Sequence, residues 1–135
     1  MFYSVDLAIP ANTLVTAPVS LRVPLPPGTV RQVDVMVPRG HAGLSHLQIF
    51  RGANQVWPTN PDGNFNGDDV VITWQEDYDL DDAPFEFVLR AWNEDDTFAH
   101  TLTVRFAMQK FAEPVQRQLE RLQQAQAIQL IEVEV

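Results

Sequence analysis

The sequence predicts an all-β fold: an antiparallel two-sheet β-sandwich, jelly-roll or immunoglobulin-like, with a C-terminal helix and a terminal β-strand arm. Three observations predict it. Apolar and polar residues alternate in seven short segments, prolines and turn-forming residues separate these segments, and one helix-forming stretch follows them. Alternation with a period of two is typical of half-buried strands, and many short strands between turns are typical of a sandwich. We expect residues 1–110 to form the sandwich domain and residues 111–135 to form the helix and strand arm.

Each of the seven segments carries its apolar residues on alternate positions. In the first segment, Tyr3, Val5 and Leu7 are separated by polar residues, so that one face of the strand is apolar. Prolines such as Pro38 and Pro84 interrupt the chain between segments, and proline is poorly tolerated inside helices and central strands. The seven expected strands span residues 2–9, 19–23, 30–37, 44–51, 70–74, 85–92 and 100–108.

One stretch is expected to be helical. Residues 112–127 are rich in helix-forming residues, and Pro114 stands in the position of a first helical turn. The apolar residues Val115, Leu119 and Leu122 are spaced by four and by three, which places them in a narrow stripe on one side of the helix. Such a stripe binds a partner or another copy of the chain, or it lies on the chain's own sandwich, and both alternatives stay open.

The last residues return to a period of two, because Glu132 and Glu134 alternate with apolar residues. We expect a strand here. Its apolar face needs a sheet to cover it, either the chain's own sheet or the exposed edge of a neighbouring subunit. We therefore expect the helix stripe and the strand arm to bind partners. The residues of this expected surface are Val115, Leu119, Leu122, Ile128, Leu130, Ile131, Val133 and Val135.

The composition narrows the function. The chain has no cysteine, which excludes disulfides, thiolate metal sites and cysteine nucleophiles. It has 18 acidic and 9 basic residues and a formal net charge of -9, which opposes binding to the phosphate backbone of nucleic acids. The N-terminus lacks the features of a signal peptide, and no segment reaches the roughly 18 apolar residues of a membrane span. We expect neither nucleic acid nor a membrane as a partner.

The polar stretch NPDGNFNGDD, residues 60–69, resembles half of the calcium-binding EF-hand loop. Oxygen-bearing residues occupy positions one, three and five of such a loop and a glycine occupies position six, but position twelve is Thr73 rather than a bidentate glutamate. Asp, Asn and Gly also build turns without an ion. We therefore expect no metal or cofactor and treat calcium as the weaker alternative. The weak calcium candidates are Asp62, Asn64, Asn66 and Asp68.

The remaining polar residues show no catalytic pattern. The acidic run at residues 75–82 is expected to be a charged loop. His41 and His46 are five residues apart and could reach one metal, but structural roles are favoured over ligation. No serine stands in a nucleophile elbow, so a Ser-His-Asp hydrolase has no support. We expect the protein not to be an enzyme.

Three tryptophans, Trp57, Trp74 and Trp92, lie in or beside expected strands. Exposed on one sheet, they would stack on sugar rings, as in carbohydrate-binding sandwiches. Buried, they belong to the core, which is the interpretation that the sequence favours.

An acidic β-sandwich without a catalytic pattern, followed by a helix and a terminal strand, resembles the small accessory proteins of tailed-bacteriophage virions, notably the capsid decoration or cement proteins. The resemblance is architectural. It implies a non-enzymatic structural protein located in the virion that forms a homo-oligomer, with a trimer as the first expectation, and binds neighbours such as a major capsid protein. The alternative is a carbohydrate-binding sandwich that uses the tryptophans and, with calcium, the loop at residues 60–69.

Overall fold

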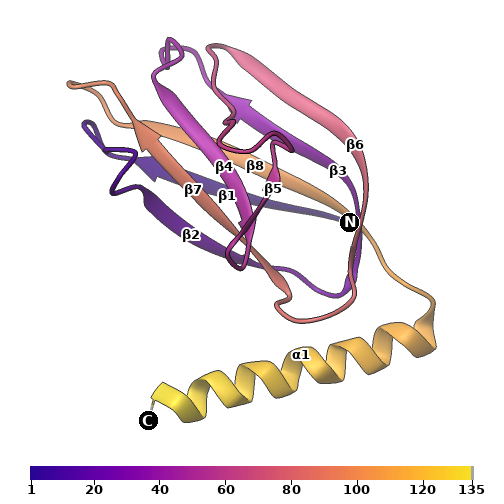
Figure 1. Cartoon of the computed structure of the whole chain (residues 1–135). Helices are drawn as coiled ribbons and strands as arrows, with labels where there is room; N and C mark the ends of the chain where they lie inside the picture. The colour runs from indigo at the N-terminus through magenta and orange to yellow at the C-terminus, as the bar shows by residue number, and fades with distance from the viewer. Residues whose placement is uncertain (135) are drawn as a thin grey trace.

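The computed structural model describes the backbone of residues 1–134 and the side chains of residues 1–127. In this part of the chain, eight strands form two four-stranded antiparallel sheets that face each other, and one helix lies across one end of them (Figure 1). The predicted two-sheet sandwich with a C-terminal helix is therefore confirmed. The elements are β1 (Phe2–Ile9), β2 (Val19–Pro24), β3 (Gly28–Val37), β4 (Ser45–Arg51), β5 (Asn54–Trp57), β6 (Val70–Leu80), β7 (Glu86–Asn93), β8 (His100–Gln109) and α1 (Glu113–Glu134).

The strand order identifies the topology. One sheet has the order β1-β8-β3-β6 and the other has the order β2-β7-β4-β5. Successive strands alternate between the two sheets, except that β4 and β5 form a hairpin within one sheet. This is the jelly-roll arrangement of eight strands, and it differs from the strand order of an immunoglobulin domain. Of the two topologies that the sequence left open, the jelly roll is the one that forms.

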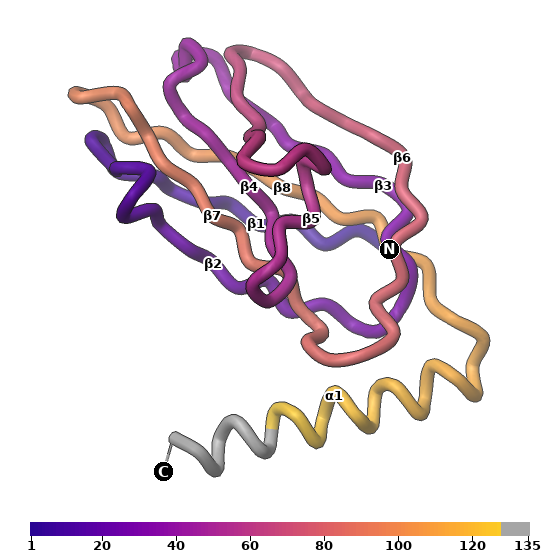
Figure 2. The backbone as a smooth tube through the Cα atoms, viewed as in Figure 1, coloured from indigo at the N-terminus to yellow at the C-terminus, as the bar shows by residue number. Residues whose placement is uncertain are grey.

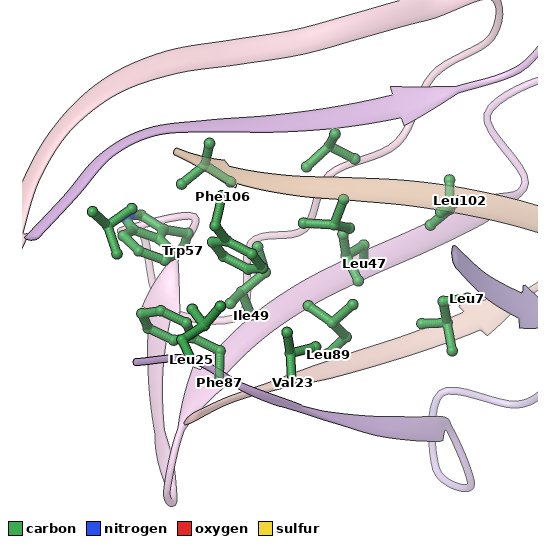
Figure 3. Close-up of a cluster of buried hydrophobic side chains, with 14 of the residues drawn as sticks. Leu7, Val23, Leu25, Leu47, Ile49, Trp57, Phe87, Leu89, Leu102 and Phe106 are labelled. Atoms are coloured by element: carbon green, nitrogen blue, oxygen red, sulfur yellow. The ribbon is translucent and has the colours of Figure 1, made fainter. Parts of the chain in front are cut away.

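The core lies between the sheets and is built from the inward-facing residues that the alternation predicts (Figure 3). Phe87 on β7 and Phe106 on β8 are both fully buried and stack across the gap between the sheets, with ring centroids 5.2 Å apart. Trp57 on β5 contacts Phe87 from the side, at a centroid distance of 5.1 Å. These aromatic rings fill one half of the sandwich, and aliphatic side chains such as those of Leu7 and Leu102 fill the other half (Figure 3).

Strand β6 continues through the acidic residues that the sequence predicts to be a loop, and that prediction is wrong. The strand alternates inward and outward along its whole length, which brings Glu76 to the inner face between Trp74 and Tyr78. The carboxylate Oε1 of Glu76 accepts the indole N–H groups of Trp57, at 2.7 Å, and of Trp74, at 3.2 Å. Because its oxygen is bound in this way, a carboxylate is tolerated at an inward position.

Helix α1 lies against the end of the sandwich where β2 leads into β3 (Figure 1). The side-chain amide of Gln116 donates to the carbonyl of Pro27 at 2.7 Å, and that of Gln123 donates to the carbonyl of Leu25 at 3.0 Å. Leu119 is buried in the same contact. The N-terminus lies at this end too, since the amino group of Met1 donates to the carbonyl of Met108 (Figure 2).

The predicted apolar stripe of the helix divides into two parts. Leu119 packs against the chain's own sandwich and is 8% exposed. Val115 and Leu122 remain 49% and 53% exposed. One residue of the stripe therefore attaches the helix to its own domain, while the other two are open to solvent in the single chain.

The predicted terminal strand is wrong, because α1 continues through these residues to Glu134. Extending a helix adds one hydrogen bond for each residue that is fixed, whereas a strand needs an edge to pair with. Within one chain, the alternating tail therefore prolongs the helix begun by the preceding Gln/Ala-rich stretch. The side chains of the other expected partner-binding residues, Ile128, Leu130, Ile131, Val133 and Val135, lie outside the described residues.

Candidate functional site

The outer face of the β2-β7-β4-β5 sheet presents alternate residues in rows that run across the strands. The register places Arg90 on β7 opposite Ser20 on β2 and opposite Gln48 on β4. In the next row, Val88 on β7 lies opposite Phe50 on β4. Because the intervening residues of these strands point into the core, the side chains of both rows point outward.

This face is hollowed. A hollow of about 580 Å³ is lined by Phe50 and Arg90 from the strands and by Asp62 from the β5–β6 loop, and a second hollow of about 480 Å³ shares Phe50 and Arg90 with it. Because they share lining residues, the two hollows adjoin. We call them together the sheet groove. Each of the two hollows by itself lies within the size range of small-ligand sites, about 300–1,000 Å³.

The β5–β6 loop is held against the sheet by two glutamine side chains. The amide of Gln55 donates to the carbonyls of Pro58, Asn60 and Gly63 at 2.8, 3.2 and 3.3 Å. The amide of Gln48 also donates to the carbonyl of Gly63, at 3.0 Å. Outward-facing amides on β4 and β5 thus satisfy the loop's backbone acceptors, and the loop forms a fixed border of the groove.

Further along the same loop, the backbone covers the exposed edge of β4. Phe65 and Leu47 exchange backbone hydrogen bonds of 2.8 and 2.9 Å. An unpaired strand edge is a site of unwanted association, and here the loop pairs with it. The conspicuous polar stretch therefore has a structural role in closing the sheet.

The four weak calcium candidates lie in this loop, and several of their oxygens are bound by protein donors. Asp68 accepts the backbone N–H groups of Ala42 and Gly40, at 3.0 and 2.8 Å, and these bonds lower the pKa of Asp68 below its ordinary value. The side-chain oxygen of Asn64 binds the ring of His46 and accepts the amide of Asn66. Asp62 has a left-handed backbone, with φ of 62°, as in a turn.

Across the described residues, no group of three or more His, Asp or Glu side chains is placed to hold a metal ion. The polar atoms of the loop bond within the protein, as turn-forming Asp and Asn residues do. The expectation of no cofactor, with calcium as the weaker alternative, stays a prediction.

The histidines do not meet at one point. The ring of His41 is buried, contacts Ser45, and lies 4.3 Å from the ring of His100. The ring of His46 stacks instead on Trp92, at a centroid distance of 5.2 Å and an interplanar angle of 15°. The structural roles that the sequence favours fit the placement of both residues, since their rings contact different neighbours.

Burial lowers the pKa of His41, and the neighbouring His100 lowers it further. The carboxylate of Asp68 and the backbone of Thr101 act in the opposite direction. His100 itself binds the carboxylate of Asp95 at 2.8 Å. The balance keeps His41 neutral in the folded protein to lower pH than in the unfolded chain.

We therefore expect stability to fall as the pH falls below 6.5, the ordinary pKa of histidine. In that range the unfolded chain binds a proton at His41 that the folded chain does not bind. The contribution of His41 to the free energy of unfolding is therefore fully present above pH 6.5 and declines below it. Urea unfolding from about pH 7.5 to about pH 5 measures this decline. The variant His41→Gln should show a shallower decline, and equal slopes for the two proteins would contradict the assignment.

The side chains of the three tryptophans are buried or half-buried. Trp57 and Trp92 are 3% and 7% exposed. Trp74 is half-buried and stacks on Phe65, at a centroid distance of 4.9 Å. The core interpretation of Trp57 is confirmed. Trp92 is also buried, but it lies outside the core cluster, where it stacks on His46 and lines the sheet groove; the more accessible aromatic ring of that groove is that of Phe50.

The comparisons with known proteins assign no family. No protein-family model matches the sequence, and no curated protein matches it. A crystal structure of PirA is 22% identical to this chain, with an alignment that covers 78% of this chain and 94% of PirA and a TM-score of 0.35. A TM-score of this size does not establish a common fold. None of the helical structure described here is long and apolar enough to cross a membrane.

Proposed function

We propose that the protein is a non-enzymatic jelly-roll module that binds saccharides in the sheet groove. The observation that carries this proposal is the mixed lining of the groove. The half-buried ring of Phe50 lies beside the guanidinium of Arg90 and the amide of Gln48, and the exposed polar residues Asn54 and Thr59 also line the groove. A sugar has an apolar C–H face and a hydroxyl-bearing edge. The first packs on an aromatic ring, and the second bonds to amides and hydroxyls.

The fold alone does not choose this function. Jelly rolls occur in lectin domains and in viral capsid proteins alike, and a fold carries many unrelated functions. The proposal therefore rests on the groove, where aromatic and hydrogen-bonding groups converge, as they do in small-molecule sites.

The test is glycan binding by the purified protein, first on an array and then by calorimetry. Phe50→Ala should weaken binding of any glycan found by at least about tenfold, because it removes the packing surface for the sugar face. Phe98→Ala is the matched control, since Phe98 is 66% exposed and lies outside the groove. If the wild type binds no glycan, or if both variants bind equally well, the proposal is wrong.

We propose a second function, that of an accessory virion protein that assembles through α1, as the resemblance to decoration proteins implies. The observation that favours it is the exposure of Val115 and Leu122 on a helix whose other contacts are with its own sandwich. Exposed apolar side chains on a helix are covered when copies of the chain associate. In this proposal the protein forms a homo-oligomer, with a trimer expected first.

Light scattering tests the second proposal. The wild type should be an oligomer, and the double variant Val115→Gln, Leu122→Gln should be a monomer with an unchanged sandwich. The control is Val70→Gln, Val71→Gln, which removes two exposed apolar residues of β6. A monomeric wild type, or equal dissociation of both double variants, would count against assembly through α1.

A further inference from the structure

Arg90 occupies the centre of the sheet groove. It lies on β7, the strand between β2 and β4, and it lines both adjoining hollows. Its neighbours across the strands are Ser20 and Gln48, which are both uncharged. A ligand that spans the two hollows therefore passes over a single positive charge.

The guanidinium of Arg90 has no hydrogen-bond or ion-pair partner among the side chains and backbone of residues 1–127. The guanidinium lies over the ring of Phe50, whose centroid is 5.6 Å from Cζ. Arg51, the other half-buried arginine of the described chain, is bound at 2.7 Å by the carboxylate of Asp82 and at 3.1 Å by the carbonyl of Pro84. The N–H donors of Arg51 are thus used within the chain, whereas those of Arg90 stay free for an acceptor from outside it.

We infer that the saccharide is an acidic one, with a uronic or sialic acid residue whose carboxylate pairs with Arg90; this inference rests on the proposed saccharide function. A carboxylate is planar and accepts two parallel N–H bonds from a guanidinium, which gives both strength and orientation. The ring of Phe50 beside the guanidinium then packs against the sugar to which the carboxylate is attached.

The charges of the site favour a carboxylate over a phosphate. One guanidinium balances one negative charge, whereas a phosphate monoester carries close to two at neutral pH. Asp62 lines the same groove, and the chain as a whole has a formal charge of -9, so a second negative charge on the ligand would be uncompensated. The overall charge acts mainly on the rate of encounter, because interactions beyond about 8 Å are screened at physiological ionic strength.

Calorimetry with matched acid and ester probes tests the inference. The probes are galacturonic acid and its methyl ester, and sialyllactose and its methyl ester. Each acid carries one carboxylate, which a methyl group caps in the ester. At least one acid should bind the wild type about tenfold tighter than its ester. Arg90→Gln should bring the ratio of acid to ester affinity close to one, whatever its effect on the affinity for the ester, and Arg90→Lys should retain part of the preference because it keeps the charge without the planar fork.

Arg22→Gln is the matched control. Arg22 lies on the outer face of β2, but its side chain is 71% exposed and 3.9 Å from Glu86, and it does not line either hollow. This variant should keep the full preference for the acid.

The outcomes separate the inference from the proposed function. Equal binding of acid and ester by the wild type would overturn the inference and leave the saccharide function standing. Failure to bind any acidic or neutral saccharide would overturn both. If Arg90→Gln does not fold, the acid-to-ester ratio of the wild type and of Arg90→Lys decides the question.

Discussion

Replacing Phe87 by alanine is expected to lower the free energy of unfolding by about 3–5 kcal/mol, the usual cost of removing a buried phenylalanine ring. The ring of Phe87 is 0% exposed and is stacked on Phe106 with an interplanar angle of 9°. Its neighbours Trp57 and Tyr78 come from β5 and β6, at the edge where the two sheets meet. The two sheets cannot close the space left by the ring without bending, so the cavity largely remains.

Urea or guanidinium denaturation measures this effect as a lower midpoint with an unchanged slope. The control is Phe98→Ala, whose ring is 66% exposed and whose removal should change the stability by no more than about 0.5 kcal/mol. A loss below about 1 kcal/mol for Phe87→Ala would mean that this half of the core is not packed as described.

The second large effect is expected at Asn93, where a leucine of similar volume should cost about 2–4 kcal/mol. Asn93 is 1% exposed, and its amide donates to the carbonyls of Phe98, Pro10 and Ile9 at 3.0, 3.3 and 3.4 Å. Its side-chain oxygen accepts the backbone N–H of Asp95 at 3.0 Å. Leucine would remove all four of these bonds. The carbonyl of Pro10 would keep the hydroxyl of Thr13 as a donor, whereas the carbonyl of Phe98 and the N–H of Asp95 would lose Asn93 as a partner. Asn93 also joins the end of β7 to β1 in the opposite sheet.

Asn93→Asp is the matched variant for this prediction. It keeps the acceptor for the backbone of Asp95 and removes the donor to the three carbonyls. At a pH where its carboxyl group is protonated, this variant should recover part of the loss, whereas the leucine variant should not. Equal stability of Asn93→Leu and the wild type would show that the network does not hold the sheets together.

The strands could be predicted because their apolar residues alternate over their whole length. Leu102, Val104 and Phe106 on β8 are an example: each is predicted to point inward and each is buried. Strand β5 has four residues, too few for a period to be recognised. The second half of β6 could not be predicted as a strand, because Glu76 occupies an inward position at which the alternation requires an apolar residue.

The sheet groove could be predicted only in its parts. Phe50 and Arg90 fall at outward positions of predicted strands. Polar or exposed residues are common at such positions, so neither residue indicates a site by itself. What brings them together is the pairing of β4 with β7, and the period of each strand says nothing about which strand lies beside it. The glutamines on β4 and β5 that position the border loop are brought together by a different pairing, that of β4 with β5.

The C-terminal residues show a different difficulty: their pattern is clear, but it predicted the wrong element. Their alternation is real, but a strand requires a neighbour, and the sequence contains no information on whether an edge is within reach. The helix that precedes them needs no such neighbour in order to continue. The alternation of the tail therefore predicted a strand where the chain forms a helix, because no sheet edge of the same chain pairs with these residues.

The pairing of the first and last strands has a mechanical consequence. Strand β1 lies at the edge of its sheet and is hydrogen-bonded only to β8, with Phe2 opposite Ala107 and Ile9 opposite His100. The chain therefore enters and leaves this strand pair at the same end. A pulling force applied between the N-terminus and α1 loads the hydrogen bonds one pair at a time instead of all together. Strand β1 should accordingly peel away at low force, whereas a force between loops at opposite ends of the sandwich would shear whole ladders and meet much greater resistance.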